Sequence, residues 1–196
     1  MQSLTVPPCD HEGLLRVLGE AQRIGTLGAA PCAEIICHST WFADALPLDV
    51  NRVIDLGSGA GVPGLIVAVV RPTLQITLVD RRAKCADALH RAVSALDLAE
   101  RVNVRCDDVE NLCRLPDWHR QFDAVISRGF GPPLRTLTLS TRFVRLGGVI
   151  VVSEPPTDAP NRWAGIDLAN MGLSGPRRLG PVAVFHVEHA TTVIDQ

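Results

Sequence analysis

The sequence predicts an α/β fold in which a doubly wound, mostly parallel sheet follows a short helical cap. Three observations support this class: short apolar runs alternate with segments of helical periodicity, a glycine-rich turn follows the first run, and polar residues stand at the ends of several runs. In a parallel sheet the carboxyl ends of the strands meet at one edge, and folds of this kind bind their ligands there. The polar residues at these ends are therefore the candidates for a functional site.

The helical cap comes first along the chain. Apolar residues recur at helical spacing in two segments, about 13–24 and 33–46. Apolar runs then predict strands at 52–56, 75–80, 102–106, 122–127 and 149–152. Periodic segments between them predict helices at 65–70, 82–98 and 134–144. From residue 155 we expect loop until a last strand at 182–187, and the chain divides into a tail and cap at 1–48 and one compact unit at 49–196.

Composition narrows the class of protein. With 196 residues, nearly half of them apolar, the chain can form a sizeable core. No apolar run is long enough to span a bilayer, and the start of the chain lacks the pattern of a signal peptide, so we expect a cytoplasmic protein without membrane contact. The formal charge of −2 does not indicate a nucleic-acid-binding protein. The basic clusters at 81–84 and 177–178 are either a phosphate-binding surface or ordinary solvated faces.

The six cysteines contain no C-x-x-C pair, and several lie in apolar runs. We therefore expect buried, reduced thiols rather than a zinc site or disulfides. His186 and His189 stand three positions apart around the end of the last predicted strand. On a strand their side chains would point to opposite faces, so no metal site is expected there.

The segment 53–64 combines the first strand with the glycine-rich turn. Glycine at Gly57, Gly59 and Gly61 lets the backbone take positive φ angles and approach a ligand closely. Pro63 follows where the first turn of a helix tolerates a missing N–H donor. The segment therefore predicts a strand, a tight turn and the start of a helix.

Asp55 and Asp80 indicate which ligand this turn binds. A pyrophosphate binds the N–H groups at a helix N-terminus, and a carboxylate beside them would repel it. S-adenosylmethionine carries an ammonium and a sulfonium group and no phosphate, so Asp55 favours this methyl donor over a nicotinamide cofactor. Asp80 ends the second strand, where a ribose-binding acid belongs with either ligand. Two alternatives stay open: the segment 59–64 matches the dinucleotide pattern G-x-G-x-x-G, and the glycines could form an empty turn with Asp80 as a helix cap.

Three segments, 55–64, 78–80 and 122–130, resemble the bacterial small-subunit (16S) ribosomal RNA guanine-N7 methyltransferases, also called glucose-inhibited division protein B. The more specific parts are the Gly-Val-Pro-Gly end of the turn and the Ile-Ser-Arg end of the fourth strand. The resemblance covers about residues 20–152 and implies a Rossmann-like fold that binds S-adenosylmethionine and acts on ribosomal RNA. It also implies donor contacts from Gly57, Val62, Val109, Glu110 and Arg128, the last near the reactive end.

The part of the site that would face the methyl acceptor differs from the family pattern. The family usually has basic residues where Asp108 and Glu154 stand. Guanine N7 has a lone pair and no proton to lose, so methylation there needs positioning but no general base. Arg128 would orient the acceptor through guanine O6 or a phosphate, unless it forms a salt bridge with Asp123 or another nearby acid. An acceptor that must lose a proton would need a base, for which Asp108, Glu154 and His38 are the candidates.

Three other functions therefore stay open. The same fold could methylate a small molecule, the turn could belong to a nucleotide-binding or nicotinamide-dependent protein, or the chain could keep the donor fold and bind RNA without catalysis. No metal is expected in any of these cases.

Overall fold

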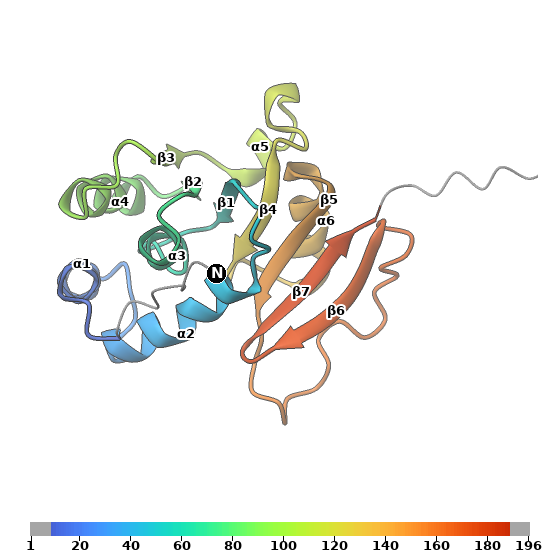
Figure 1. The fold of residues 1–196 in the computed structure, drawn as a ribbon, viewed down its shortest axis with the longest axis horizontal. Coiled ribbons are helices and arrows are strands. Elements are labelled where there is room, and N and C mark those ends of the chain that lie inside the picture. The colour runs from blue at the N-terminus through green and yellow to red at the C-terminus, as the bar shows by residue number, and fades with distance from the viewer. Residues whose placement is uncertain (1–8, 189–196) are drawn as a thin grey trace, which may run out of the picture.

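The computed structural model describes residues 9–188 and contains a seven-stranded sheet in the order β3-β2-β1-β4-β5-β7-β6 (Figure 1). Its strands are β1 (Arg52–Leu56), β2 (Gln75–Asp80), β3 (Val102–Cys106), β4 (Phe122–Ser127), β5 (Val144–Ser153), β6 (Leu173–Leu179) and β7 (Val182–Val187). Strands β1 to β5 are parallel to one another, and β7 runs antiparallel to both β5 and β6. The doubly wound, mostly parallel sheet that the sequence predicts is confirmed.

The order of the strands reverses at β1. The chain adds β2 and then β3 on one side of β1, and later adds β4 and β5 on the other side. In such sheets the crevice at the reversal point, at the carboxyl ends of the strands, is where ligands bind. The glycine-rich turn follows β1 directly and therefore stands at this point.

Helices cover both faces of the sheet (Figure 1). They are α1 (Glu12–Arg23), α2 (Cys32–Ala45), α3 (Gly64–Val70) and α4 (Ala83–Ala95) on one face, and α5 (Val109–Leu112) and α6 (Pro133–Phe143) on the other, with a short 3-10 turn at Pro116–Trp118. Each face of the sheet has its own hydrophobic core. Within β1, Val53 packs into the core on the α1–α4 face and Ile54 into the core on the α5–α6 face, because side chains on a strand alternate between faces. Burial on both faces explains why the strands are continuous apolar runs.

One strand was not predicted. We expected loop at β6, because the segment 175–178, Gly-Pro-Arg-Arg, shows no alternation of apolar and polar residues. The strand lies at the edge of the sheet and most of its side chains are exposed, which is where a sheet tolerates proline. Strand β5 also begins earlier than expected, at Val144, because its pairing with β4 continues across an irregularity in register.

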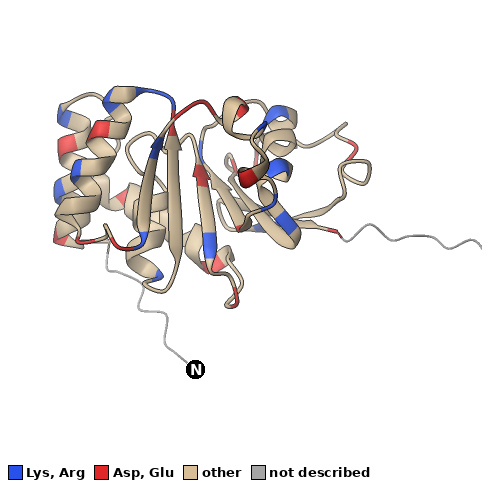
Figure 2. Ribbon diagram, turned by 90° about the horizontal axis from the view of Figure 1, so that it is seen from above, with Lys and Arg blue, Asp and Glu red and all other residues tan. Residues whose placement is uncertain are grey.

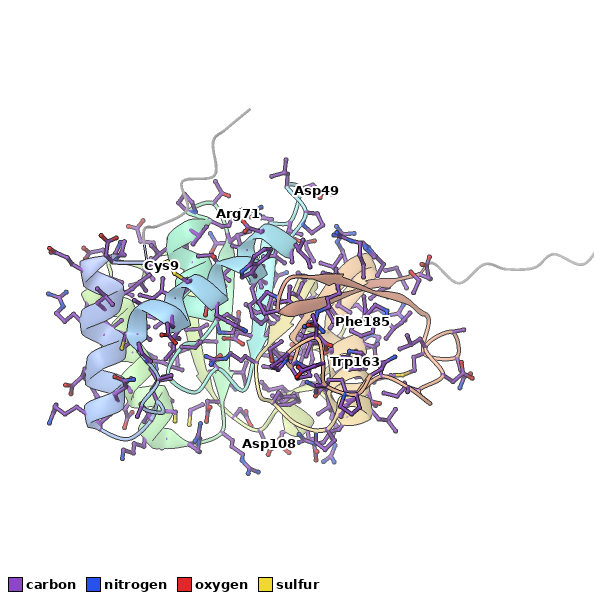
Figure 3. The ribbon with its side chains drawn as sticks, turned by 90° about the horizontal axis from the view of Figure 1, so that it is seen from below. Cys9, Asp49, Arg71, Asp108, Trp163 and Phe185 are labelled. Atoms are coloured by element: carbon purple, nitrogen blue, oxygen red, sulfur yellow. A yellow bond between two sulfur atoms is a disulfide. The ribbon has the colours of Figure 1, made fainter. Side chains whose placement is uncertain are left out.

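Cys9 and Cys37 form a disulfide, so the prediction that all six cysteines are buried reduced thiols is wrong (Figure 3). Their Cα atoms lie 5.4 Å apart, within the range that a disulfide spans. Of the four free cysteines Cys85 is buried, as expected, whereas Cys106 is exposed. Apolar periodicity reports burial, but it does not report that the segment before α1 approaches α2.

Arg71 joins the helical cap to the sheet. It is 5% exposed, and its guanidinium donates hydrogen bonds to the carbonyl oxygens of Ala43 (3.2 Å), Leu46 (3.2 Å) and Pro47 (3.1 Å). These carbonyls lie at and after the C-terminal end of α2, where a helix leaves acceptors without partners. Arg71 lies at the opposite end of the molecule from Asp108 (Figure 3), so this anchor is remote from the carboxyl edge of the sheet.

Two further expectations concern membranes and metals. Within residues 9–188, no helix is both long and apolar enough to cross a membrane. The same part of the chain contains no group of three His, Cys, Asp or Glu residues placed to hold a metal ion. His186 is exposed on β7, but His189 lies outside the described residues, so the predicted orientation of this pair is not tested.

Candidate active site

A cavity of about 440 Å³ opens at the carboxyl edge of the sheet, beside the turn after β1. Its walls come from this turn, the segments that follow β2 and β3, and the loop after β4. The lining residues are Gly57, Val79, Asp80, Arg81, Arg82, Asp107, Asp108, Val109, Gly129, Phe130 and Arg135. Figure 2 shows basic and acidic segments next to each other along this edge. The volume suits a small-molecule ligand, and the mixed charges can hold a polar one.

The glycine-rich turn brings the backbone against the ends of two strands. Gly57 and Gly59 have φ angles of +72° and +56°, in the left-handed region that glycine adopts without strain. A Cβ at Gly57 would lie 2.8 Å from the ring of Phe130, so only glycine fits between this ring and the turn. The N–H of Gly59 donates to Asp80 Oδ2 at 2.9 Å. The turn therefore holds the carboxylate that ends β2.

Gly61 and Val62 face the protein interior. At Gly61, where φ is +88°, a Cβ would lie 2.3 Å from the side chain of Leu65, so this glycine permits the start of α3 to pack closely. Val62 is 6% exposed and packs into the core on the α1–α4 face. Neither residue lines the cavity. Their contacts with a methyl donor stay predictions.

Asp55 lies beneath the turn rather than on the cavity wall. Its side chain is fully buried, its Oδ2 accepts the N–H of Gly64 at 3.0 Å, and its Oδ1 has no hydrogen-bond partner among the described residues. Burial raises the pKa of Asp55 to about 7, although the hydrogen bond from the Gly64 N–H lowers it. The sequence predicts that this carboxylate faces the ligand, whereas in the structure it lies where it positions the start of α3. Its direct contact with a donor stays a prediction.

Asp80 lines the cavity although it is only 5% exposed. The guanidinium of Arg82 pairs with it through two bonds, Nε to Oδ1 at 3.0 Å and Nη2 to Oδ2 at 3.1 Å. Burial alone would raise the pKa of Asp80, but the hydrogen bonds and charge of Arg82, with the N–H of Gly59, outweigh burial and hold it below its usual range. Asp80 is therefore an ionised hydrogen-bond acceptor in the wall of the cavity.

Val109 and Glu110 begin α5, directly beyond the end of β3. Val109 is 4% exposed and, with Val79, forms an apolar part of the lining. Glu110 is not part of the lining, and its carboxylate pairs with Arg135 at 2.9 Å. The Arg135 guanidinium in turn lies 5.0 Å from the ring centroid of Phe130. This connected group bounds the cavity on the side of α5 and α6.

Arg128 follows β4 and lies half-buried at the border of the cavity, since the next two residues line it. Burial lowers the pKa of Arg128, and burial together with the charge of Arg128 lowers the pKa of His38. The predicted alternative, a salt bridge between Arg128 and Asp123, is wrong. Asp123 instead pairs with Arg145 at 2.6 Å and accepts two backbone N–H groups at the start of β1. Among the described residues Arg128 forms no ion pair.

The two acids that depart from the family pattern are both engaged within the protein. Asp108 caps α5 by accepting the N–H of Glu110 at 2.9 Å, and its other oxygen lies 3.7 Å from Arg81. Glu154 accepts the indole N–H of Trp163 at 2.7 Å and lies 3.6 Å from Arg178. Neither acid is therefore an unpaired base.

Three of the nine predicted site residues, Gly57, Asp80 and Val109, line the cavity. Neither Phe130 nor Arg135 has a role that the sequence alone predicts, and the role of the basic cluster that contains Arg82 stays open from sequence. Phe130 belonged to the segment that carried the family resemblance, which was the one available signal for it. Arg135 stands on the first turn of α6, a helix that begins at the carboxyl edge of the sheet, but its pairing with Glu110 depends on tertiary structure.

The fold is similar to that of several solved structures. An O-methyltransferase family protein from Burkholderia thailandensis superposes with a TM-score of 0.59 at 18% identity, covering 79% of this chain and 57% of that chain. A protein of known structure from Corynebacterium glutamicum superposes with a TM-score of 0.61 at 15% identity, covering 90% of each chain. At such low identity these similarities establish the fold alone.

The family follows from sequence comparison. The family model described as rRNA small subunit methyltransferase G (GidB) matches residues 35–155, and the chain belongs to this family. Ribosomal RNA small subunit methyltransferase G of a Nocardioides species is 35% identical over 138 residues, which are 70% of this chain and 53% of the relative. The protein of that name from a Synechococcus species is 40% identical over 88 residues, 45% of this chain and 36% of the relative. The chain spans about a third to a half of the length of the curated relatives it matches.

Proposed function

We propose that this protein transfers the methyl group of S-adenosylmethionine to N7 of a guanine in small-subunit ribosomal RNA. One observation carries the proposal: the segment that matches the family, residues 35–155, also supplies all the residues that line the cavity. The names of the relatives state an activity on small-subunit ribosomal RNA, and we extend it to this chain. Such a substrate would place the protein in the cytoplasm.

The residues of the cavity fit S-adenosylmethionine in their chemistry. Asp80 offers an ionised carboxylate suited to ribose hydroxyls, and Val79 and Val109 offer an apolar surface suited to adenine. Gly57 of the glycine-rich turn lines the cavity and has no side chain of its own, so its backbone can approach a ligand. When bound, S-adenosylmethionine supplies an electrophilic methyl group carried by a sulfonium. The protein's part is to hold donor and acceptor in line, which can contribute most of the rate enhancement of such a displacement.

Two of the three candidate bases are already engaged, which favours an acceptor without a proton to lose. Asp108 and Glu154 take part in hydrogen bonds and ion pairs. His38, whose Nδ1 is buried without a partner among the described residues, is the remaining candidate. A hydroxyl or amine acceptor would need one of these groups as a general base, whereas guanine N7 needs none. Arg128, half-buried and outside every described ion pair, is the group we assign to orient guanine O6 or a phosphate.

Two measurements test this proposal. Calorimetric titration with S-adenosylhomocysteine and with NAD identifies the ligand of the cavity, and binding of NAD alone would overturn the proposal. Mapping of 7-methylguanosine in small-subunit ribosomal RNA, from strains with and without the gene, identifies the acceptor. Equal methylation in both strains would exclude guanine N7 of this RNA and point to a small-molecule acceptor or to RNA binding without catalysis.

A pair of arginine variants tests the assigned residue. In transfer of labelled methyl to small subunits from the deletion strain, we expect Arg128→Ala to lower the rate on the order of 100-fold, because it removes an orienting group. The matched control is Arg91→Ala, which removes an exposed arginine from α4, outside the lining of the cavity. If both variants keep the rate of the unmodified protein, Arg128 does not orient the acceptor.

A further inference from the structure

The carboxylate of Asp80 has no acceptor site left for a ligand. An ionised carboxylate offers about four lone-pair positions. Oδ1 accepts the backbone N–H of Arg82 at 2.9 Å and its Nε–H at 3.0 Å. Oδ2 accepts the N–H of Gly59 at 2.9 Å and the Nη2–H of Arg82 at 3.1 Å. All four positions are therefore filled by the protein itself.

These four bonds are of two kinds. The backbone N–H groups of Gly59 and Arg82 belong to the turn after β1 and to the residue that precedes α4, so they are held by the fold. The other two bonds come from the guanidinium at the end of the long Arg82 side chain, which is 59% exposed, whereas the Asp80 side chain is 5% exposed. The guanidinium can therefore leave into solvent, but the carboxylate cannot turn away.

The guanidinium fork presents two parallel N–H donors to the two oxygens of Asp80. A ribose with free 2′ and 3′ hydroxyls presents two O–H donors with a similar spacing. Both Asp80 and Arg82 line the cavity, so the Arg82 guanidinium and the two ribose hydroxyls would compete for the same oxygens of Asp80. Binding of a nucleoside exchanges one pair of donors for another and adds no new bond to Asp80.

Resting on the proposed function, we propose that Arg82 determines the affinity and ribose selectivity of the donor site by occupying the ribose-binding carboxylate until a nucleoside displaces it. A ligand with both hydroxyls must displace the guanidinium, and so its affinity is lowered by the strength of that pair. A ligand without the hydroxyls leaves the pair intact and is not penalised. Arg82 is thus a specificity-determining residue that acts through Asp80.

The test measures two ligands on three proteins by calorimetry: S-adenosylhomocysteine and its 2′,3′-dideoxy analogue, on the unmodified protein, Arg82→Met and Lys84→Met. We expect Arg82→Met to bind S-adenosylhomocysteine about three to ten times more tightly, the range for an exposed but bidentate charged pair. The same variant should bind the dideoxy analogue within twofold of the unmodified protein. Lys84→Met removes an equal charge from an exposed position on the first turn of α4, outside the cavity lining, and should change neither affinity by more than about twofold.

Three results would overturn the inference about Arg82. An equal gain for both ligands would mean a general charge effect, an unchanged affinity would mean that the pair does not compete, and a loss would mean that Arg82 itself contacts the ligand. Thermal unfolding of each variant, with Tm within a few degrees, ensures that folded proteins are compared. Absence of S-adenosylhomocysteine binding in all three proteins would instead overturn the proposed function, and the inference with it.

Discussion

Asp55 makes the stability of this protein depend on pH in a direction unusual for an acid. Its carboxyl is fully buried and one of its oxygens has no hydrogen-bond partner among the described residues, so burial raises its pKa from 3.8 to about 7. The folded protein then holds a proton on Asp55 at pH values where the unfolded chain has lost it. The resulting stabilisation is fully present below about pH 4 and is lost as the pH rises through about 7.

The perturbation is Asp55→Asn, which keeps an oxygen for the N–H of Gly64 but cannot ionise. Between pH 4.5 and pH 8.5 the difference between the two pKa values corresponds to about 3 kcal/mol of stability that the unmodified protein loses and the variant does not. The variant should therefore gain about 3 kcal/mol relative to the unmodified protein over this interval. A constant offset from burying the amide NH₂ group does not affect this change.

The assay is urea unfolding at several pH values for both proteins, with the free energy of unfolding extrapolated to water. Other titrating groups contribute equally to both curves and cancel in the difference. Asp87→Asn, an exposed position on α4, is the control and should follow the unmodified protein at every pH. If the curve for Asp55→Asn also runs parallel to that of the unmodified protein, the carboxyl at position 55 is not protonated in the folded state and the reasoning fails.

Three further predictions concern the packing around the site and the cap. Gly61→Ala should destabilise the protein by about 2–4 kcal/mol, because its φ is +88° and the added Cβ would lie 2.3 Å from Leu65; a Tm shift below about 3 °C would contradict this. Arg71→Ala should cost about 2–4 kcal/mol in urea unfolding, since three carbonyl oxygens near the end of α2 lose their donor; recovery to within 1 kcal/mol by Arg71→Lys would show that charge alone matters. Reduction of the disulfide between Cys9 and Cys37, which are 28 residues apart, should lower stability by about 3 kcal/mol, and a double serine variant should show the same stability with and without reductant.

The bounds of five strands could be predicted to the residue. Those expected for β1, β2, β3, β4 and β7 agree with the structure. The edge strand β6 could not be predicted in this way, since its pairing with β7 comes from backbone hydrogen bonds and not from burial of its side chains. The spacing of apolar residues predicts which side chains are buried, and few side chains of β6 are buried.

The candidate site divides in the same manner. Asp80 could be located because a strand end in a parallel sheet has a known position, and Asp80 lines the cavity in the structure. Arg135 could not be located, because its role depends on an ion pair with Glu110 across 25 residues of chain. For Asp55, the sequence supplied the residue and its place on β1, but not the direction in which the carboxylate points.

By itself, therefore, the sequence determined the fold class, the positions of the parallel strands and the edge at which their ends meet, because local periodicity reports which side chains leave water. Only the tertiary structure decided that Asp55 lies beneath the turn, that Cys9 reaches Cys37 and that Arg82 and Gly59 together fill the acceptor sites of Asp80. These outcomes depend on distances between separate segments and on the exclusion of water from one carboxylate. Neither quantity is encoded in the spacing of residues along the chain.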